Sequence, residues 1–261
     1  MPKFVLFILL IFIASGLKAQ TWEIGGGVGG AGYMGDLNPN NPVKVSGPSV
    51  SGFFAHNFNG YLSAKLNFTL ANISAADSNS SSQQFRDRNL SFTTTLGEVS
   101  AIAEFNFMKY IPEIGNNKFT PYIYAGFAGL AFRPTTIYNG SRVSLRGQRT
   151  EGEAKSYSKF AFSIPYGVGI KYNVFSSFTL GANIGYRNPN TDYLDDVSGV
   201  YPVKSQLTPL SRALSDRSGE KTGVYIGSPG TQRGDGNSRD TYFITQITLS
   251  YTFISQKCYF Q

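Results

Sequence analysis

Apolar and polar side chains alternate with a period of two along most of this sequence. From Leu62 to Leu70 every second residue is apolar, and the residues between them are serine, lysine, asparagine and threonine. Because successive side chains of a β-strand point to opposite faces, this stretch predicts a strand with one apolar and one polar face. The pattern is strong over residues 98–107, 160–171, 178–187 and 243–253, and weaker over residues 22–33, 49–58 and 121–133. We therefore expect eight strands in all.

Three features favour a membrane barrel over a soluble β-sandwich, which would also alternate. Most of the expected strands exceed the common length of about 5–6 residues and suit a tilted membrane crossing. Phe and Tyr residues stand at the strand ends, as an interfacial girdle requires. Long connections alternate with short ones: residues 34–48, 73–92, 134–158 and 188–240 are long, and residues 57–60, 108–118 and 174–177 are short or moderate. The sequence therefore predicts an all-β fold, an eight-stranded antiparallel transmembrane β-barrel with long extracellular loops.

The N-terminal residues predict an exported protein. A basic start, a short apolar run and a small residue at position 19 are typical of a signal peptide over residues 1–19. The alternative is a retained anchor, but the run is shorter than the roughly 20 apolar residues that a spanning helix needs. The barrel is then expected over residues 20–253 of an outer membrane, followed by a C-terminal tail over residues 254–261.

Six charged residues fall on polar strand faces, and in a narrow barrel those faces point inward. They are Glu23, Lys65, Glu98, Glu104, Lys171 and Arg187. Because buried charges must be paired, we expect interior ion pairs that fill the lumen, and a proton or ion path is the alternative. A filled lumen argues against a general porin.

The sequence offers little for catalysis or nucleic-acid binding. His56 is the only histidine, and neither a nucleophile motif nor a metal-ligand spacing accompanies it. We therefore expect no enzyme activity and no cofactor. The net charge of +7 is dispersed rather than gathered in a basic run, so nucleic acid is not an expected partner. No small-molecule substrate is expected either.

The longest connection contains a helix signal and an acidic cluster. Thr208 and Pro209 predict the cap and first position of one short helix over residues 207–214. Asp192, Asp195 and Asp196 stand within five residues in the stretch "TDYLDDVSGVY". They offer either calcium ligands or, as we favour, Asp–Arg pairs and turn caps that order the loop. By contrast, residues 75–92 are expected to start as a polar, mobile tip.

Several segments together resemble the PorG-like outer-membrane β-barrel family of the Bacteroidota, which belongs to the type IX secretion system. They include "YMGDLNPNNP", "EFNFMKYIP", "PYGVGIKYN", "TDYLDDVSGVY" and "PGTQRGDGNSRDTYF". The resemblance implies an accessory or scaffold barrel in outer-membrane lipid that associates with the periplasmic ring of PorK and PorN. The alternative is a general structural or small-ligand barrel of the OmpA type, not tied to secretion.

The resemblance also marks positions for loop ordering or partner contact. These are Asp36, Asn89, Asp192, Tyr193, Asp195, Asp196, Arg233 and Asp240. Ring contact would use the longest periplasmic turn, residues 109–118, which contains Lys109, Tyr110, Glu113 and Lys118.

Overall fold

The structure, a computed structural model, describes residues 21–113, 115–237 and 239–253. The expected signal peptide over residues 1–19 and tail over residues 254–261 lie outside these residues. None of the helices in the described ranges is long and apolar enough to cross a membrane.

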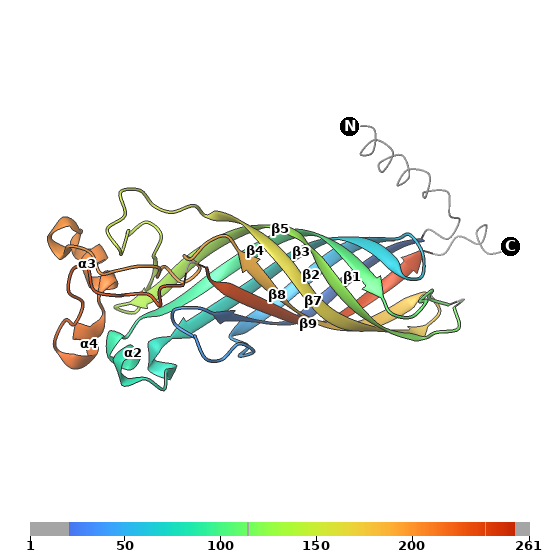
Figure 1. Cartoon of the computed structure of the whole chain (residues 1–261), viewed down its shortest axis with the longest axis horizontal. Coiled ribbons are helices and arrows are strands. Elements are labelled where there is room, and N and C mark those ends of the chain that lie inside the picture. The colour runs from blue at the N-terminus through green and yellow to red at the C-terminus, as the bar shows by residue number, and fades with distance from the viewer. Residues whose placement is uncertain (1–20, 114, 238, 254–261) are drawn as a thin grey trace.

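Eight strands form one closed antiparallel barrel (Figure 1). They are β1 (Thr21–Met34), β2 (Gly47–Asn57), β3 (Leu62–Ala76), β4 (Ser91–Asn106), β5 (Phe119–Tyr138), β7 (Phe160–Phe175), β8 (Phe178–Pro189) and β9 (Thr241–Phe253). The first strand pairs with the last, from Trp22 opposite Phe253 to Met34 opposite Thr241, and β4 pairs with β5. No strand in the ring has a free edge along these ladders, so the barrel prediction is confirmed over the sandwich.

The side-chain distribution of the barrel is the reverse of a soluble protein. On β3, Ser63 and Thr69 point inward and are buried, whereas Leu66 and Leu70 point outward and are exposed. The same outward apolar face recurs on every barrel strand, with Val28, Val50, Val99, Phe127, Phe162, Leu180 and Ile247 among the exposed residues. An apolar band around a polar interior is the solvation pattern of a barrel in lipid.

Three strands continue beyond the expected boundaries. β3 runs to Ala76, β4 starts at Ser91 and β5 ends at Tyr138, so the connections predicted over residues 73–92 and 134–158 are shorter than expected. The walls therefore project past the apolar band on one side. There the pattern changes phase: on β3, Ala71 and Ile73 are buried inside the barrel, whereas Leu66 and Leu70 face outward.

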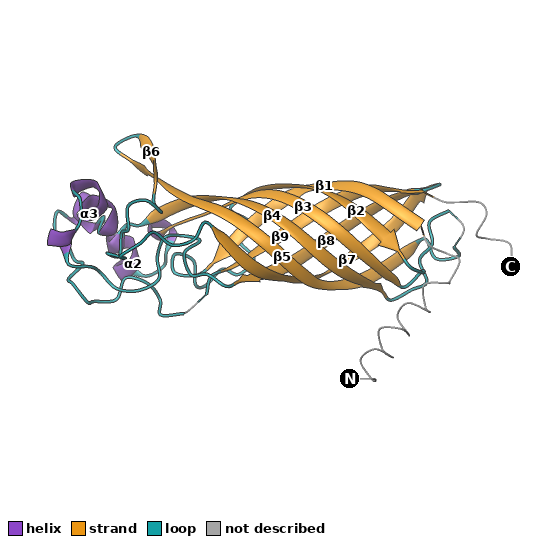
Figure 2. Ribbon diagram, turned by 90° about the horizontal axis from the view of Figure 1, so that it is seen from above, coloured by secondary structure: helices purple, strands orange, loops and turns teal. Residues whose placement is uncertain are grey.

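A ninth strand, β6 (Ser141–Ser144), was not predicted. It folds back on the end of β5, with Tyr138 opposite Ser141. Asn139 and Gly140 form the turn, and both have positive φ angles, of 48° and 76°. This is the Asn-Gly turn that suits the twist of a two-residue hairpin, and the dipeptide was the available sequence signal. Figure 2 shows this hairpin projecting beyond the barrel.

Helices gather at the same end, away from the start of β1 and the end of β9 (Figures 1 and 2). The helix predicted in the last loop is α3 (Pro209–Ser215), and Thr208 accepts the Ser211 N–H as expected of its cap. The prediction of one helix there was incomplete, because α4 (Ser218–Thr222) follows it. Residues 75–92, expected to start as a mobile tip, contain a 3-10 turn (Asp77–Asn79) and helix α2 (Gln83–Arg88), neither of which was predicted.

Candidate functional site

The middle of the lumen is filled by two groups of charged side chains. Glu104 accepts from Lys65 Nζ at 2.5 Å and from Lys171 Nζ at 2.6 Å. Glu98 lies 3.4 Å from Arg187 Nε and accepts from the Tyr242 hydroxyl at 2.5 Å. The structure thus places five of the six expected interior charges in ion pairs.

The sixth charge differs. Glu23 forms no ion pair within the described residues and accepts only a long hydrogen bond of 3.4 Å from Asn57. The cavity beside the paired charges measures about 30 Å³, which is room for only a few water molecules. The lumen at this level therefore contains side chains rather than an aqueous channel.

The acidic stretch of the last loop folds into the mouth of the barrel. Leu194 and Val197 are fully buried in an apolar cluster with Tyr33, Phe92 and Leu214. Thr94 on the barrel wall donates its hydroxyl to the Leu194 carbonyl at 2.5 Å. Leu194 and Val197 therefore form an apolar plug that closes this mouth of the lumen. Asp195 and Asp196, which lie between them, are buried with the plug.

Hydroxyl groups, rather than arginine side chains, hold Asp196. Thr150 and Tyr157 each donate to its carboxylate at 2.6 Å. Burial raises the pKa of Asp196 to about 6, against the lowering effect of nearby Arg233. The expected Asp–Arg pairing was therefore wrong here, because Arg233 donates to the Asp196 carbonyl oxygen and pairs with Glu151 at 2.8 Å. The expected turn cap is present at Asp195, which accepts the Val197 N–H.

The flanking residues of this stretch are less enclosed. Tyr193 stacks on Tyr157 with ring centroids 4.4 Å apart, so it supports the plug from the side. Asp192 lines an open cavity of about 450 Å³ beside the start of β9, and burial raises its pKa to about 6.

A buried arginine joins three loops, and sequence reasoning missed it. Arg88, at the end of α2, binds both carboxylate oxygens of Asp77, at 2.6 and 2.7 Å. It also donates to the backbone carbonyls of Asp36 and Arg233, at 3.0 and 2.6 Å. Next to it, Asn89 adopts a left-handed conformation and donates to the Arg217 carbonyl. Arg88 and Asn89 thus anchor the second loop to the first and last loops.

Three predicted residues from distant segments meet in one buried cluster. Asp36 follows β1, Asp195 lies in the last loop and Asp240 precedes β9, yet each contributes an oxygen within 4.8 Å of the others. The Tyr33 hydroxyl lies 2.6 Å from Asp195 and 2.9 Å from Asp240. Burial raises the pKa of Asp36 to about 7. Burial, and then the neighbouring carboxylates, raise the pKa values of Asp195 and Asp240 well above their usual range.

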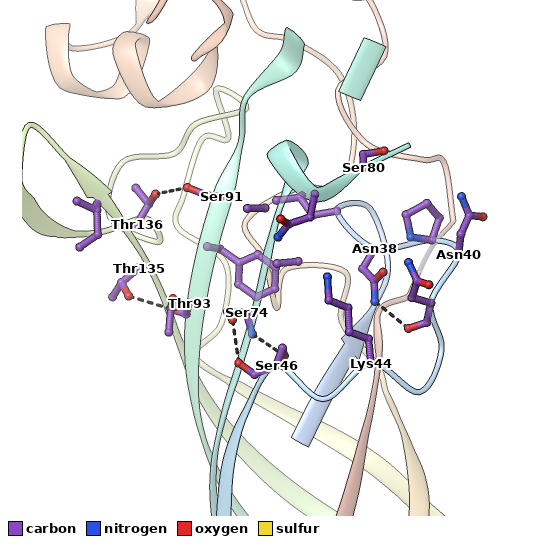
Figure 3. A pocket seen from close by; sticks show the side chains of 18 of the residues that line it. Asn38, Asn40, Lys44, Ser46, Ser74, Ser80, Ser91, Thr93, Thr135 and Thr136 are labelled. Carbon is purple, nitrogen blue, oxygen red and sulfur yellow. Dashed lines mark hydrogen bonds between the residues drawn. The ribbon is translucent and has the colours of Figure 1, made fainter. Parts of the chain in front are cut away.

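A pocket of about 620 Å³ opens beside the plug (Figure 3). Asn38, Asn40 and Lys44 line it from the first loop, facing Thr93 and Thr135 on the ends of β4 and β5. Asn, Ser and Thr side chains share the lining with the apolar residues Leu37, Phe92 and Ile137, so the pocket offers both hydrogen-bonding groups and apolar surface to a ligand. Sequence reasoning did not single it out, because these residues are far apart in the chain.

At the opposite end, the turn over residues 109–118 covers the other mouth. Tyr110 is buried there and shares a hydrogen bond of 2.7 Å with Thr179, and burial raises its pKa to about 12. Glu113 accepts from Ser177 at 3.1 Å. Lys109 and Lys118 are exposed, so the turn presents two cations to its surroundings.

Comparison with known proteins identifies the family. The sequence matches the family described as "Domain of unknown function (DUF6089)" over residues 2–216. The chain belongs to the DUF6089 family. No match was found among curated proteins.

The DUF6089 chain is also similar to solved membrane barrels at low identity. The N-terminal β-barrel domain of Pseudomonas aeruginosa OprF is 12% identical, with 90% of this chain and 98% of that chain covered and a TM-score of 0.39. Neisserial surface protein A is 12% identical, with 90% and 96% covered and a TM-score of 0.42. The outer membrane protein OprG from Pseudomonas aeruginosa is 10% identical, with 92% and 99% covered and a TM-score of 0.42.

Proposed function

We propose that this DUF6089 barrel is a non-catalytic accessory or scaffold component of the type IX protein secretion system in the outer membrane. The observation that carries the proposal is closure of the lumen at three levels. Leu194 plugs the extracellular mouth, the Glu104 ion pairs fill the middle, and Tyr110 covers the periplasmic mouth. A barrel closed in this way acts through its outer surfaces, so its two ends and its wall are the places for partners.

The periplasmic end is the proposed contact for ring proteins of the PorK and PorN type. Lys109 and Lys118 are exposed there, while Tyr110 is held inside the barrel. Substitution of the two lysines should therefore change the charge of this surface without displacing Tyr110 from the mouth of the lumen. The sequence resemblance to PorG-like barrels supplies the identity of the partner.

A pulldown of the tagged barrel from outer membranes in mild detergent tests this role. We expect PorK- and PorN-like proteins to co-purify with the wild-type barrel and to be lost from a Lys109→Glu/Lys118→Glu variant. Lys155→Glu, an exposed change on an extracellular loop, is the matched control and should retain them. Recovery of the barrel alone, with normal secretion in a deletion strain, would contradict the proposal.

The pocket beside the plug favours a second candidate, a general structural or small-ligand barrel of the OmpA type. Its 620 Å³ volume and its mixed lining of Asn, Ser, Thr and apolar side chains suit a small ligand that forms hydrogen bonds. Native mass spectrometry of the purified barrel distinguishes the two. A small molecule retained by the wild type and lost from an Asn38→Leu variant would favour this candidate, and an empty barrel that binds the ring proteins would exclude it.

A further inference from the structure

The carboxylates of Asp36, Asp195 and Asp240 form no ion pair in the described part of the chain, although Arg88 donates to the backbone carbonyl of Asp36. All three residues are at least 98% buried. The nearby guanidinium groups are engaged elsewhere, because Arg88 binds Asp77 and Arg233 binds Glu151. Carboxylates this close repel one another unless protons or a cation neutralise them.

The hydrogen bonds around the cluster leave lone pairs without a donor. Asp36 accepts the Asp235 N–H with Oδ1, but its Oδ2 is buried and has no partner in the described part of the chain. The Tyr33 hydroxyl faces both Asp195 and Asp240 but carries only one proton. An oxygen-rich site with unmatched lone pairs is therefore built into the interior of the cap.

The spacing of the oxygens fits a calcium ion. Calcium binds oxygen at 2.3–2.6 Å, so two ligands on opposite sides of the ion lie up to about 5.2 Å apart. The three carboxylate oxygens lie within 4.8 Å of one another. Magnesium, with ligands at about 2.0–2.1 Å, demands a strict octahedron and usually keeps several waters, whereas calcium accepts more protein oxygens in a flexible geometry.

An open cavity borders the buried cluster on one side. Asp240 lines this cavity of about 450 Å³, and Asp192 and Asp235 lie in the same wall. The exposed Arg239 also lines this cavity and carries a positive charge, opposite to that of the three aspartates there. Of the three carboxylates of the cluster, Asp240 alone lines this cavity, so an ion would approach the cluster past Asp240. The cavity has room for waters that complete calcium coordination.

We propose that Asp36, Asp195 and Asp240 form a calcium site. The ligands join the segment after β1, the plug of the last loop and the segment before β9. β1 and β9 are the strands that close the barrel, so the ion fastens the extracellular cap over the closing seam. The site rests on this geometry alone and stands independently of a role in secretion.

Terbium luminescence on the purified, folded full-length barrel tests the site. Because Tyr33 contacts two of the ligands, excitation of tyrosine should sensitise bound Tb³⁺, and excess Ca²⁺ should displace it. We expect half-displacement by Ca²⁺ on the order of 10⁻⁴–10⁻³ M, the range of extracellular calcium modules. Asp195→Asn and Asp240→Asn keep an oxygen for the Val197 and Leu194 N–H groups but remove a charge. Each should lower the luminescence at least tenfold.

Asp196→Asn is the matched control. It is adjacent and equally buried, it lies outside the cluster, and its left-handed backbone, with φ of 70°, is one that asparagine tolerates. It should bind Tb³⁺ as the wild type does. Heat-modifiable migration on gels verifies that each variant is folded. A second measurement needs no variant: calcium should protect the last loop of the wild-type barrel from protease. Absence of both Tb³⁺ binding and calcium protection in the wild type would overturn the site, as would equal loss in Asp196→Asn.

Discussion

At the scale of single residues, the extracellular cap depends on buried charges that each bind several backbone groups. Arg88 connects Asp77 with the carbonyls of Asp36 and Arg233. Asp216 accepts the Lys204 ammonium at 2.6 Å and the N–H groups of Ser218 and Gly227. These residues stabilise the loops because each leaves several partners unsatisfied when it is removed.

Replacing Arg88 with alanine should loosen the cap without unfolding the barrel. It leaves Asp77 as a buried, unpaired charge, and breaking such a pair costs about 3–5 kcal/mol. Limited proteolysis should cut the second and last loops much faster than in the wild type. Arg86→Ala in the same helix is the control, because Arg86 donates only to Ser80, Ser81 and Gln83 within its own loop. Equal resistance of both variants would contradict this role for Arg88.

Acid should loosen the region around α3 and α4 through Asp216. Burial by itself would raise the pKa of this carboxyl, but hydrogen bonds from Lys204, Ser218 and Gly227 outweigh it and hold the pKa below the usual value. A lowered pKa means that this stabilisation is complete above about pH 4, the ordinary range for aspartate, and is lost as the pH falls through the folded-state value. The protection factors of the amides over residues 204–227, which correct for the pH dependence of intrinsic exchange, should fall on acidification, and Asp216→Asn should remove that fall.

At the scale of elements, β6 shows how a turn extends the barrel wall. Asn139 and Gly140 both adopt positive φ, a conformation that costs a branched residue about 1–2 kcal/mol. Gly140→Val should therefore release the β6 hairpin and speed exchange of the Ser141–Ser144 amides. Gly147→Ala is the control, since a Cβ at position 147 meets open space. Unchanged protection of β6 in Gly140→Val would show that its side chains, rather than the turn, hold it.

The strands could be predicted from the sequence because their signal is local. Alternation alone assigns Leu66 to the outer face of its strand and Ser63 to the inner face. The cap is different, because Asp36 meets Asp240 and Arg88 meets Arg233 only after the barrel has closed. The last-loop motif singled out Asp195 and Asp196, but the residues that donate to them, Tyr33, Thr150 and Tyr157, had no sequence signal. The β6 turn could have been found from its Asn-Gly pair.

At the scale of the whole molecule, an apolar wall surrounds a lumen that is closed at both mouths and in the middle. The central pairs are coupled, since Glu104 neutralises both Lys65 and Lys171. Glu104→Gln should therefore destabilise the barrel by about 3–5 kcal/mol, because it leaves two buried ammonium groups without an anion. Urea unfolding in lipid vesicles measures this loss, with Glu113→Gln on the exposed turn as the control. Equal midpoints for both variants would contradict the coupling.

Conductance of the purified barrel in planar lipid bilayers tests the closed lumen most directly. We expect no stable open-channel current from the wild type, because the Leu194 plug, the Glu104 pairs and Tyr110 obstruct the path in series. A steady, voltage-independent conductance from the intact wild-type barrel would contradict this expectation, and would place the function in transport through the lumen rather than in contact at its ends.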